Sequence, residues 1–135
     1  MRYPSEPPPE PRDGAGMPLE ALELHEATLV GLDAAGLPAR LDLLVGDVRI
    51  DGEARTVRVS FRHGTKLQRD GQPLRAPEME MPDAEILSLA RPRPGQWDLI
   101  VRWSDFSRRQ SRTVSYVIGA ERGEASLLPR QAASP

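Results

Sequence analysis

The side chains best suited to catalysis in this chain are its two histidines, each considered with a nearby carboxylate. His25 precedes Glu26, and the two could act as a base and its orienting carboxylate if the fold brought a substrate to them. Adjacent residues of a strand, however, point to opposite faces. Neither His25 nor His63 lies in a spacing typical of metal ligands. We therefore interpret His25 as a histidine at a strand entrance that hydrogen-bonds to the backbone, and the same reasoning applies to His63.

A second candidate is the acidic segment 78–85, which also contains Met79 and Met81. Its carboxylates could hold a cation or act as a paired acid and base, but such work needs convergent geometry and shifted pKa values. Prolines keep this stretch irregular or at a sheet edge. We interpret the segment as a solvated loop, in which the methionines cap a core edge or contact a partner.

The local basic cluster contains Arg108, Arg109 and Arg112 and follows Asp105. A positive patch of this kind would bind nucleic acid through its phosphates. The net charge of −2 supplies no long-range attraction for nucleic acid or for anionic lipid. The nearby aromatic residues mostly occupy alternating positions that a core would claim, which leaves few platforms for base stacking. We therefore expect neither nucleic acid nor a membrane as the partner.

The elements that must position these residues are strands, and two aromatic ones define the fold class. Residues 97–103 and 113–118 alternate apolar and polar residues, which is the pattern of half-buried strands. One face of this expected hairpin carries Trp97, Leu99, Val101, Trp103, Val114, Tyr116 and Ile118.

Further strands are expected at 24–32, 40–50 and 56–63, with a bulge or bend at Gly46-Asp47. Asp51-Gly52 and Asp70-Gly71 are dipeptides suited to tight turns. Residues 83–90 could form two helical turns or a buried strand. The proline and glycine punctuation after them favours a hairpin, so we predict a strand.

The expected fold is therefore all-β, an antiparallel meander of about six strands that forms a sandwich or a partly open barrel. The chain of 135 residues fits one domain, which we place at residues 20–121. The segment 1–19 holds six of the 14 prolines and is expected to be disordered. Residues 122–135 are expected to form a flexible tail.

The sequence lacks cysteine, the apolar region of a signal peptide and a long apolar run, and these absences bear on the compartment and on cofactors. There is no cysteine, which excludes disulfides and thiolate zinc sites. The N-terminal residues lack the apolar region of a signal peptide, and no apolar run approaches the roughly 20 residues of a membrane span. We expect a cytoplasmic protein without a cofactor.

The strand at Leu24-His25-Glu26-Ala27-Thr28-Leu29, together with Val57-Arg58-Val59-Ser60-Phe61 and Ser115-Tyr116-Val117-Ile118, resembles small bacterial β-rich proteins that begin with a His-Asp-Ala-type strand. The resemblance covers about residues 22–121, and Glu26 stands where that pattern commonly has aspartate. Some proteins of this kind are immunity factors of contact-dependent or polymorphic toxin systems. The resemblance implies a β-rich fold and a protein partner, and it transfers no catalytic residue.

We therefore expect a non-enzymatic protein-binding or accessory domain, and an immunity-like role is one version of this hypothesis. The alternative is a small hydrolase or ligand-binding barrel, in which His25 or His63 works with a carboxylate of Glu80, Asp83, Glu85 or Asp105. The candidate interaction residues are His25, Glu26, His63, Asp105, Arg108, Arg109 and Arg112.

Overall fold

A computed structural model describes residues 16–19 and 22–129, and within these ranges the chain forms one antiparallel sheet. The expected all-β antiparallel fold is confirmed, but the sheet has ten strands in the described residues where about six were expected. The strands are β1 (Gly16–Pro18), β2 (Thr28–Asp33), β3 (Arg40–Ile50), β4 (Glu53–Arg62), β5 (Lys66–Arg69), β6 (Gln72–Leu74), β7 (Asp83–Arg93), β8 (Gln96–Asp105), β9 (Gln110–Gly119) and β10 (Arg122–Leu127).

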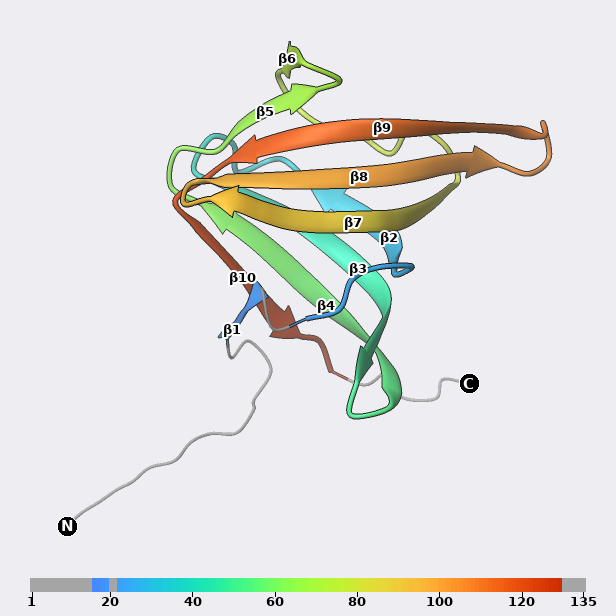
Figure 1. Cartoon of the computed structure of the whole chain (residues 1–135), viewed down its shortest axis with the longest axis horizontal. Helices are drawn as coiled ribbons and strands as arrows, with labels where there is room; N and C mark the ends of the chain where they lie inside the picture. Colours follow the sequence, from blue (N-terminus) through green and yellow to red (C-terminus); the bar gives the residue numbers. More distant parts are fainter. Residues whose placement is uncertain (1–15, 20–21, 130–135) are drawn as a thin grey trace.

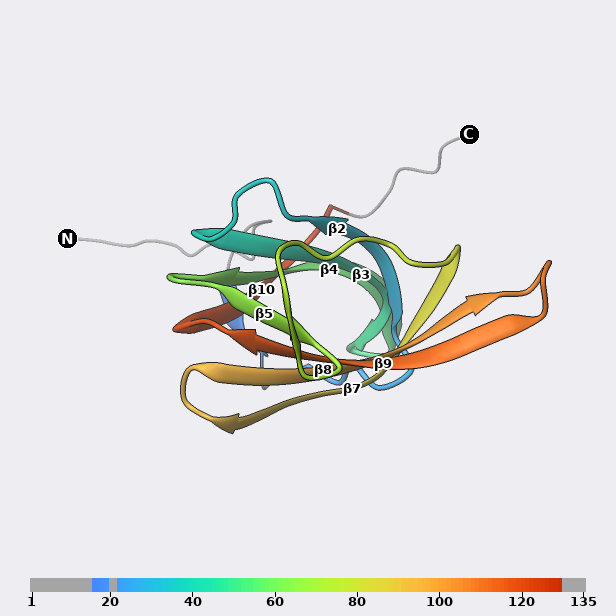
Figure 2. The same ribbon diagram turned by 90° about the horizontal axis from the view of Figure 1, so that it is seen from above.

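The sheet curls around its own core. Its strand order is β1-β10-β4-β3-β2-β7-β8-β9-β5-β6, and Figure 2 shows β2, β3 and β4 on one side of the interior with β7, β8 and β9 on the other. Phe61 of β4 meets Trp97 of β8 edge to face, with ring centroids 5.6 Å apart. The two layers that pack together are therefore halves of one continuous sheet.

Two bent segments connect the halves of the sheet. Strand β4 leads into β5 through residues 63–65, and β9 leads into β10 through residues 120–121. Because β4 pairs with β10 and β5 pairs with β9, the two bent segments run antiparallel in both halves. At the bend, the Glu121 amide donates to the His63 carbonyl over 3.5 Å.

The sheet extends beyond the domain limits expected from the sequence. Strand β10 lies in the segment 122–135 that was expected to be a tail, and β1 lies in the segment 1–19 that was expected to be disordered. Residues 122–127 add their backbone hydrogen bonds to β4, and Ala125 is fully buried, which explains why they are ordered. Residues 1–15 and 130–135 of the two expected terminal segments lie outside the described residues.

The turn and bulge predictions are confirmed. Asp51-Gly52 and Asp70-Gly71 have positive φ at both residues and connect neighbouring antiparallel strands. The register of β3 against β4 shifts between Val45 and Val48, where Asp47 has a φ of 59°. The ambiguous segment 83–90 lies in strand β7.

The core consists of the inward faces that alternation predicts. Trp97, Trp103 and Phe61 are its largest fully buried side chains. Each large apolar side chain buried in this way contributes about 1.5–3 kcal/mol. In the part of the chain that the structure describes, no helix is both long and apolar enough to cross a membrane.

Candidate functional site

Four of the seven candidate interaction residues lie together at the end of the β8–β9 hairpin. Asp105, Arg108, Arg109 and Arg112 all belong to residues 105–112, which we call the hairpin tip. Figure 1 shows this hairpin projecting beyond the other strands. The β8–β9 pairing continues as far as Asp105 and Gln110, so the projecting part is a regular two-stranded ribbon with a short turn.

The turn of the hairpin tip is held by Asp105. One carboxylate oxygen of Asp105 accepts hydrogen bonds from the Ser107 hydroxyl at 2.7 Å and from the Arg108 amide at 3.3 Å. The Arg109 amide donates to the Phe106 carbonyl, with Arg109 at a φ of 53°. The hydrogen bond from Ser107 is the main cause that lowers the pKa of Asp105. The charged carboxylate therefore fixes the turn, which is a positioning role.

Phe106 is the exposed aromatic residue of this turn. Its side chain is 74% exposed, so it is the exception to the expectation that the aromatic residues near the basic cluster mostly occupy core positions. The alternation of β8 ends before it, so no inward face is left for its ring. Arg109 and Phe106 line a shallow hollow of about 460 Å³ together with Glu85 and Arg102, and these last two form an ion pair at 3.2 Å. The hairpin tip thus presents an apolar ring among arginines.

His25 and Glu26 lie where the two halves of the sheet join. The His25 Nδ1 atom donates to the Leu87 carbonyl of β7 over 2.6 Å, which confirms the expected backbone bond. The Glu26 amide donates to the Ile86 carbonyl, and the Ile86 amide donates to the Ala27 carbonyl. The hydrogen bond that the ring donates to the Leu87 carbonyl is the main cause that raises the pKa of His25. These contacts join β7 to the segment before β2 and give His25 and Glu26 a structural role.

His63 lies at the bend between β4 and β5, with a φ of 74°. Its amide donates to the Ala39 carbonyl, and its side chain is exposed. Within residues 16–19 and 22–129, neither histidine ring hydrogen-bonds to the carboxylates that the hydrolase alternative requires. The same residues contain no group of three or more side chains placed to hold a metal ion.

The most connected polar group in the described residues is the Glu80 carboxylate, in the segment 75–82 that we call the strap. Arg69 of β5 donates to both of its oxygens, at 2.7 and 2.8 Å. From β9, the Tyr116 hydroxyl donates at 2.8 Å and Arg112 at 3.3 Å. The Trp103 indole N–H donates in turn to the Tyr116 oxygen over 3.1 Å.

Glu80 corrects the interpretation of segment 78–85 as a solvated loop. Its side chain is only 14% exposed, because the strap crosses the end of the core and places Pro77 against it. The hydrogen bonds from Arg69, followed by that from Tyr116, hold the pKa of Glu80 below its usual range. The exposed Glu78 and Met79 fit the earlier interpretation, whereas Glu80 is an anchor of the strap.

Tyr116 is expected to lose its hydroxyl proton at a higher pH than an exposed tyrosine does. Burial and the hydrogen bond to Glu80 raise its pKa from 10.0 to about 12. Since the folded-state pKa is raised, the neutral phenol stabilises the fold below the ordinary pKa, and this contribution is lost as the pH rises through about 12. In a Tyr3→Phe variant, which leaves Tyr116 as the remaining tyrosine, the near-ultraviolet absorbance of tyrosinate should rise near pH 12. A midpoint at the ordinary value with the protein still folded would contradict the burial of this network.

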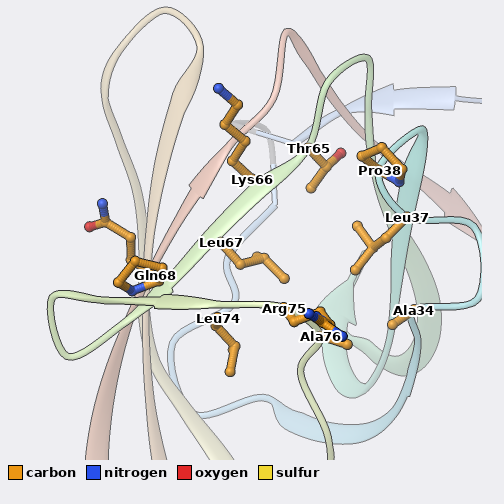
Figure 3. Close-up of a pocket in the computed structure, with 11 residues that line it drawn as sticks. Ala34, Leu37, Pro38, Thr65, Lys66, Leu67, Gln68, Leu74, Arg75 and Ala76 are labelled. Atoms are coloured by element: carbon orange, nitrogen blue, oxygen red, sulfur yellow. The ribbon is translucent and has the colours of Figure 1, made fainter.

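A groove opens beside the strap, between the loop that follows β2 and the β5–β6 hairpin. Figure 3 shows Leu37, Leu67 and Leu74 around it. Its volume is about 700 Å³, within the range of small-molecule sites. The apolar interior behind the strap leaves a cavity of about 20 Å³, so its side chains already fill it.

No protein family, curated protein or solved structure matches this chain.

Proposed function

We propose that this protein is a non-enzymatic binding domain that docks onto another protein through its hairpin tip. The observation that carries the proposal is Phe106, a 74% exposed ring on a turn that Asp105 already orders. A rigid aromatic side chain loses little conformational entropy when it enters a pocket, and such anchors dominate binding energies at interfaces. In this proposal the curled sheet is a partly open barrel that holds the base of the hairpin.

The arginines of the hairpin tip indicate the chemistry of the partner. The Arg108 side chain is 75% exposed, and its Nε atom lies 3.8 Å from the Asp105 carboxylate. Arg109 makes no ion pair with any residue that the structure describes. Guanidinium groups that are this accessible favour an acidic surface around the pocket and speed association by steering. A toxin recognised by an immunity-like protein is one such partner.

Affinity purification from the native host, followed by mass spectrometry, tests this proposal with the full chain and a Phe106→Ala variant. The wild type should retain a stoichiometric protein partner that the variant loses. Against the purified partner, Phe106→Ala should weaken binding about ten-fold, since truncated aromatic anchors cost about 1–2 kcal/mol or more. The thermal midpoint should not change, because Phe106 lies outside the core.

Val30→Ala is the matched control, because Val30 is 51% exposed and lies on β2. It should keep the partner at full affinity. Recovery of the same partner at the same affinity with Phe106→Ala, or failure to recover any partner under several growth conditions, would overturn the hairpin tip as the binding surface.

A further inference from the structure

The Glu80 site is an anion site in which the protein's own strap supplies the anion. The donors belong to the sheet: Arg69 lies on β5, and Arg112 and Tyr116 lie on β9. Two guanidinium groups thus face one carboxylate, at 2.7 to 3.3 Å. Two nitrogens of the Arg69 guanidinium each donate to a different oxygen of the Glu80 carboxylate. This paired geometry selects a planar carboxylate.

This anion site borders an apolar interior. Trp103 and Tyr116 belong both to the hydrogen-bond chain and to the lining of the interior cavity. Pro77 of the strap lines the same cavity. The other lining residues are all apolar, namely Leu29, Leu32, Leu41, Leu43, Leu67, Leu99 and Ile118.

The strap separates this interior from the groove of Figure 3. Leu67 lines both the groove and the interior cavity. Arg75 and Ala76 line the groove, and Pro77, the next residue, lines the cavity. Displacing the strap would therefore extend the open groove to the edge of the filled apolar interior, where Tyr116 donates to Glu80.

The hold of the strap on the sheet depends strongly on Glu80. The strap has no regular secondary structure between Ala76 and Glu80, and Glu78 and Met79 are exposed. Pro77 and Met81 are half-buried, so their apolar contribution is partial. A competing carboxylate that takes the donors of Glu80 removes the largest polar attachment of the strap.

We propose that this site binds a small amphipathic carboxylate of the fatty-acid type, which replaces Glu80 between Arg69, Arg112 and Tyr116. Because side chains already fill the interior, the alkyl chain takes the place of Pro77 at its edge and continues into the groove beside Leu67. Binding is conditional on displacing the strap, so the apparent affinity of the wild type is reduced by the fraction of molecules in which the strap is open. The inference goes beyond the proposed function, because the strap site shares only Arg112 with the hairpin tip and does not include Phe106.

Titration of the full wild-type chain with octanoate, followed by NMR of the two indole N–H signals, tests the proposal. A Trp97→Phe variant assigns the signal of Trp103. Octanoate should shift the Trp103 signal, because its hydrogen-bond acceptor Tyr116 changes partner. Octanol, which has the same chain without the charge, should shift it far less at equal concentration.

Glu80→Gln sharpens the test, because the neutral amide leaves both arginines without their carboxylate. This variant should bind octanoate at least about ten-fold more tightly than the wild type. A change of about ten-fold in affinity corresponds to the free energy of one charge-assisted hydrogen bond. Adding Arg69→Gln to it should abolish the gain, whereas Phe106→Ala should leave octanoate binding unchanged.

Three outcomes would overturn the proposal: no shift of the Trp103 signal in the wild type, equal shifts with octanoate and octanol, or no gain of affinity in a folded Glu80→Gln variant. If that variant does not fold, the comparison of octanoate with octanol on the wild type decides. Phe106→Ala removes the proposed anchor of the hairpin tip and leaves the strap site intact. The proposal for the strap site and the proposal for the hairpin tip can therefore fail independently.

Discussion

Replacing Gly123 with alanine is expected to lower the free energy of unfolding by about 2–3 kcal/mol. A Cβ atom at Gly123 would lie 2.6 Å from the Cζ2 atom of Trp97, closer than such atoms approach. Trp97 is buried and is already contacted by Phe61, edge to face, and by the Arg91 guanidinium, 4.8 Å from its ring centre. The ring therefore has little room to move, and the backbone of β10 must shift instead.

Gly119→Ala is the matched control for this substitution. Gly119 also lies in a strand beside the bend, but its added Cβ would have no neighbour closer than 3.8 Å. We expect a cost below about 1 kcal/mol there. Urea unfolding of both variants gives the comparison, and equal stability losses would show that Trp97 does not pack on Gly123 as described.

Arg69→Met is expected to destabilise the protein by about 2–3 kcal/mol at neutral pH, because it leaves a largely buried carboxylate with weaker partners. The Arg69 fork supplies the two shortest contacts from a cation to Glu80. The folded protein lowers the pKa of Glu80, so its stabilising contribution is present above the ordinary value of 4.5 and is lost as the pH falls below it. The difference between wild type and variant should accordingly shrink in acid.

Arg112→Met provides the comparison, since Arg112 contacts the same carboxylate at 3.3 Å and its side chain is 52% exposed. An exposed pair of this kind contributes less than about 1 kcal/mol. Unfolding by urea at neutral pH and in acid should show the larger, pH-dependent loss for Arg69→Met alone. A loss for Arg69→Met that stays constant from neutral to acid pH would mean that Glu80 is not its partner.

Sequence patterns predicted the local structure because its causes are local. Alternation identifies the buried faces of β8 and β9 since side chains of a strand alternate between faces. The Asp-Gly pairs at 51–52 and 70–71 mark turns because both residues adopt positive φ. The prolines and glycine after Ala90 correctly favoured a strand over a helix for residues 83–90.

The sequence could not predict features that depend on distant segments. Glu80 is largely buried where Arg69 of β5 and Tyr116 of β9 donate to it, and no spacing near Glu80 indicates these partners. Residues 122–127 have few apolar side chains, so their order depends on backbone pairing with β4. Phe106 is of a residue type that is usually buried. It is exposed because it lies in the turn of a hairpin that projects beyond the other strands (Figure 1).

The partnership of β4 with β10 also affects the order in which the protein folds during synthesis. Strand β4 emerges from the ribosome early, but Arg62 finds its partner Arg122 only after nearly all described residues have been made. Until then one side of β4 offers unpaired backbone groups to any neighbouring chain. Such distant pairings make folding slow and leave the nascent chain open to aggregation. Early translation termination before residue 122 should therefore yield aggregates and not a smaller stable domain.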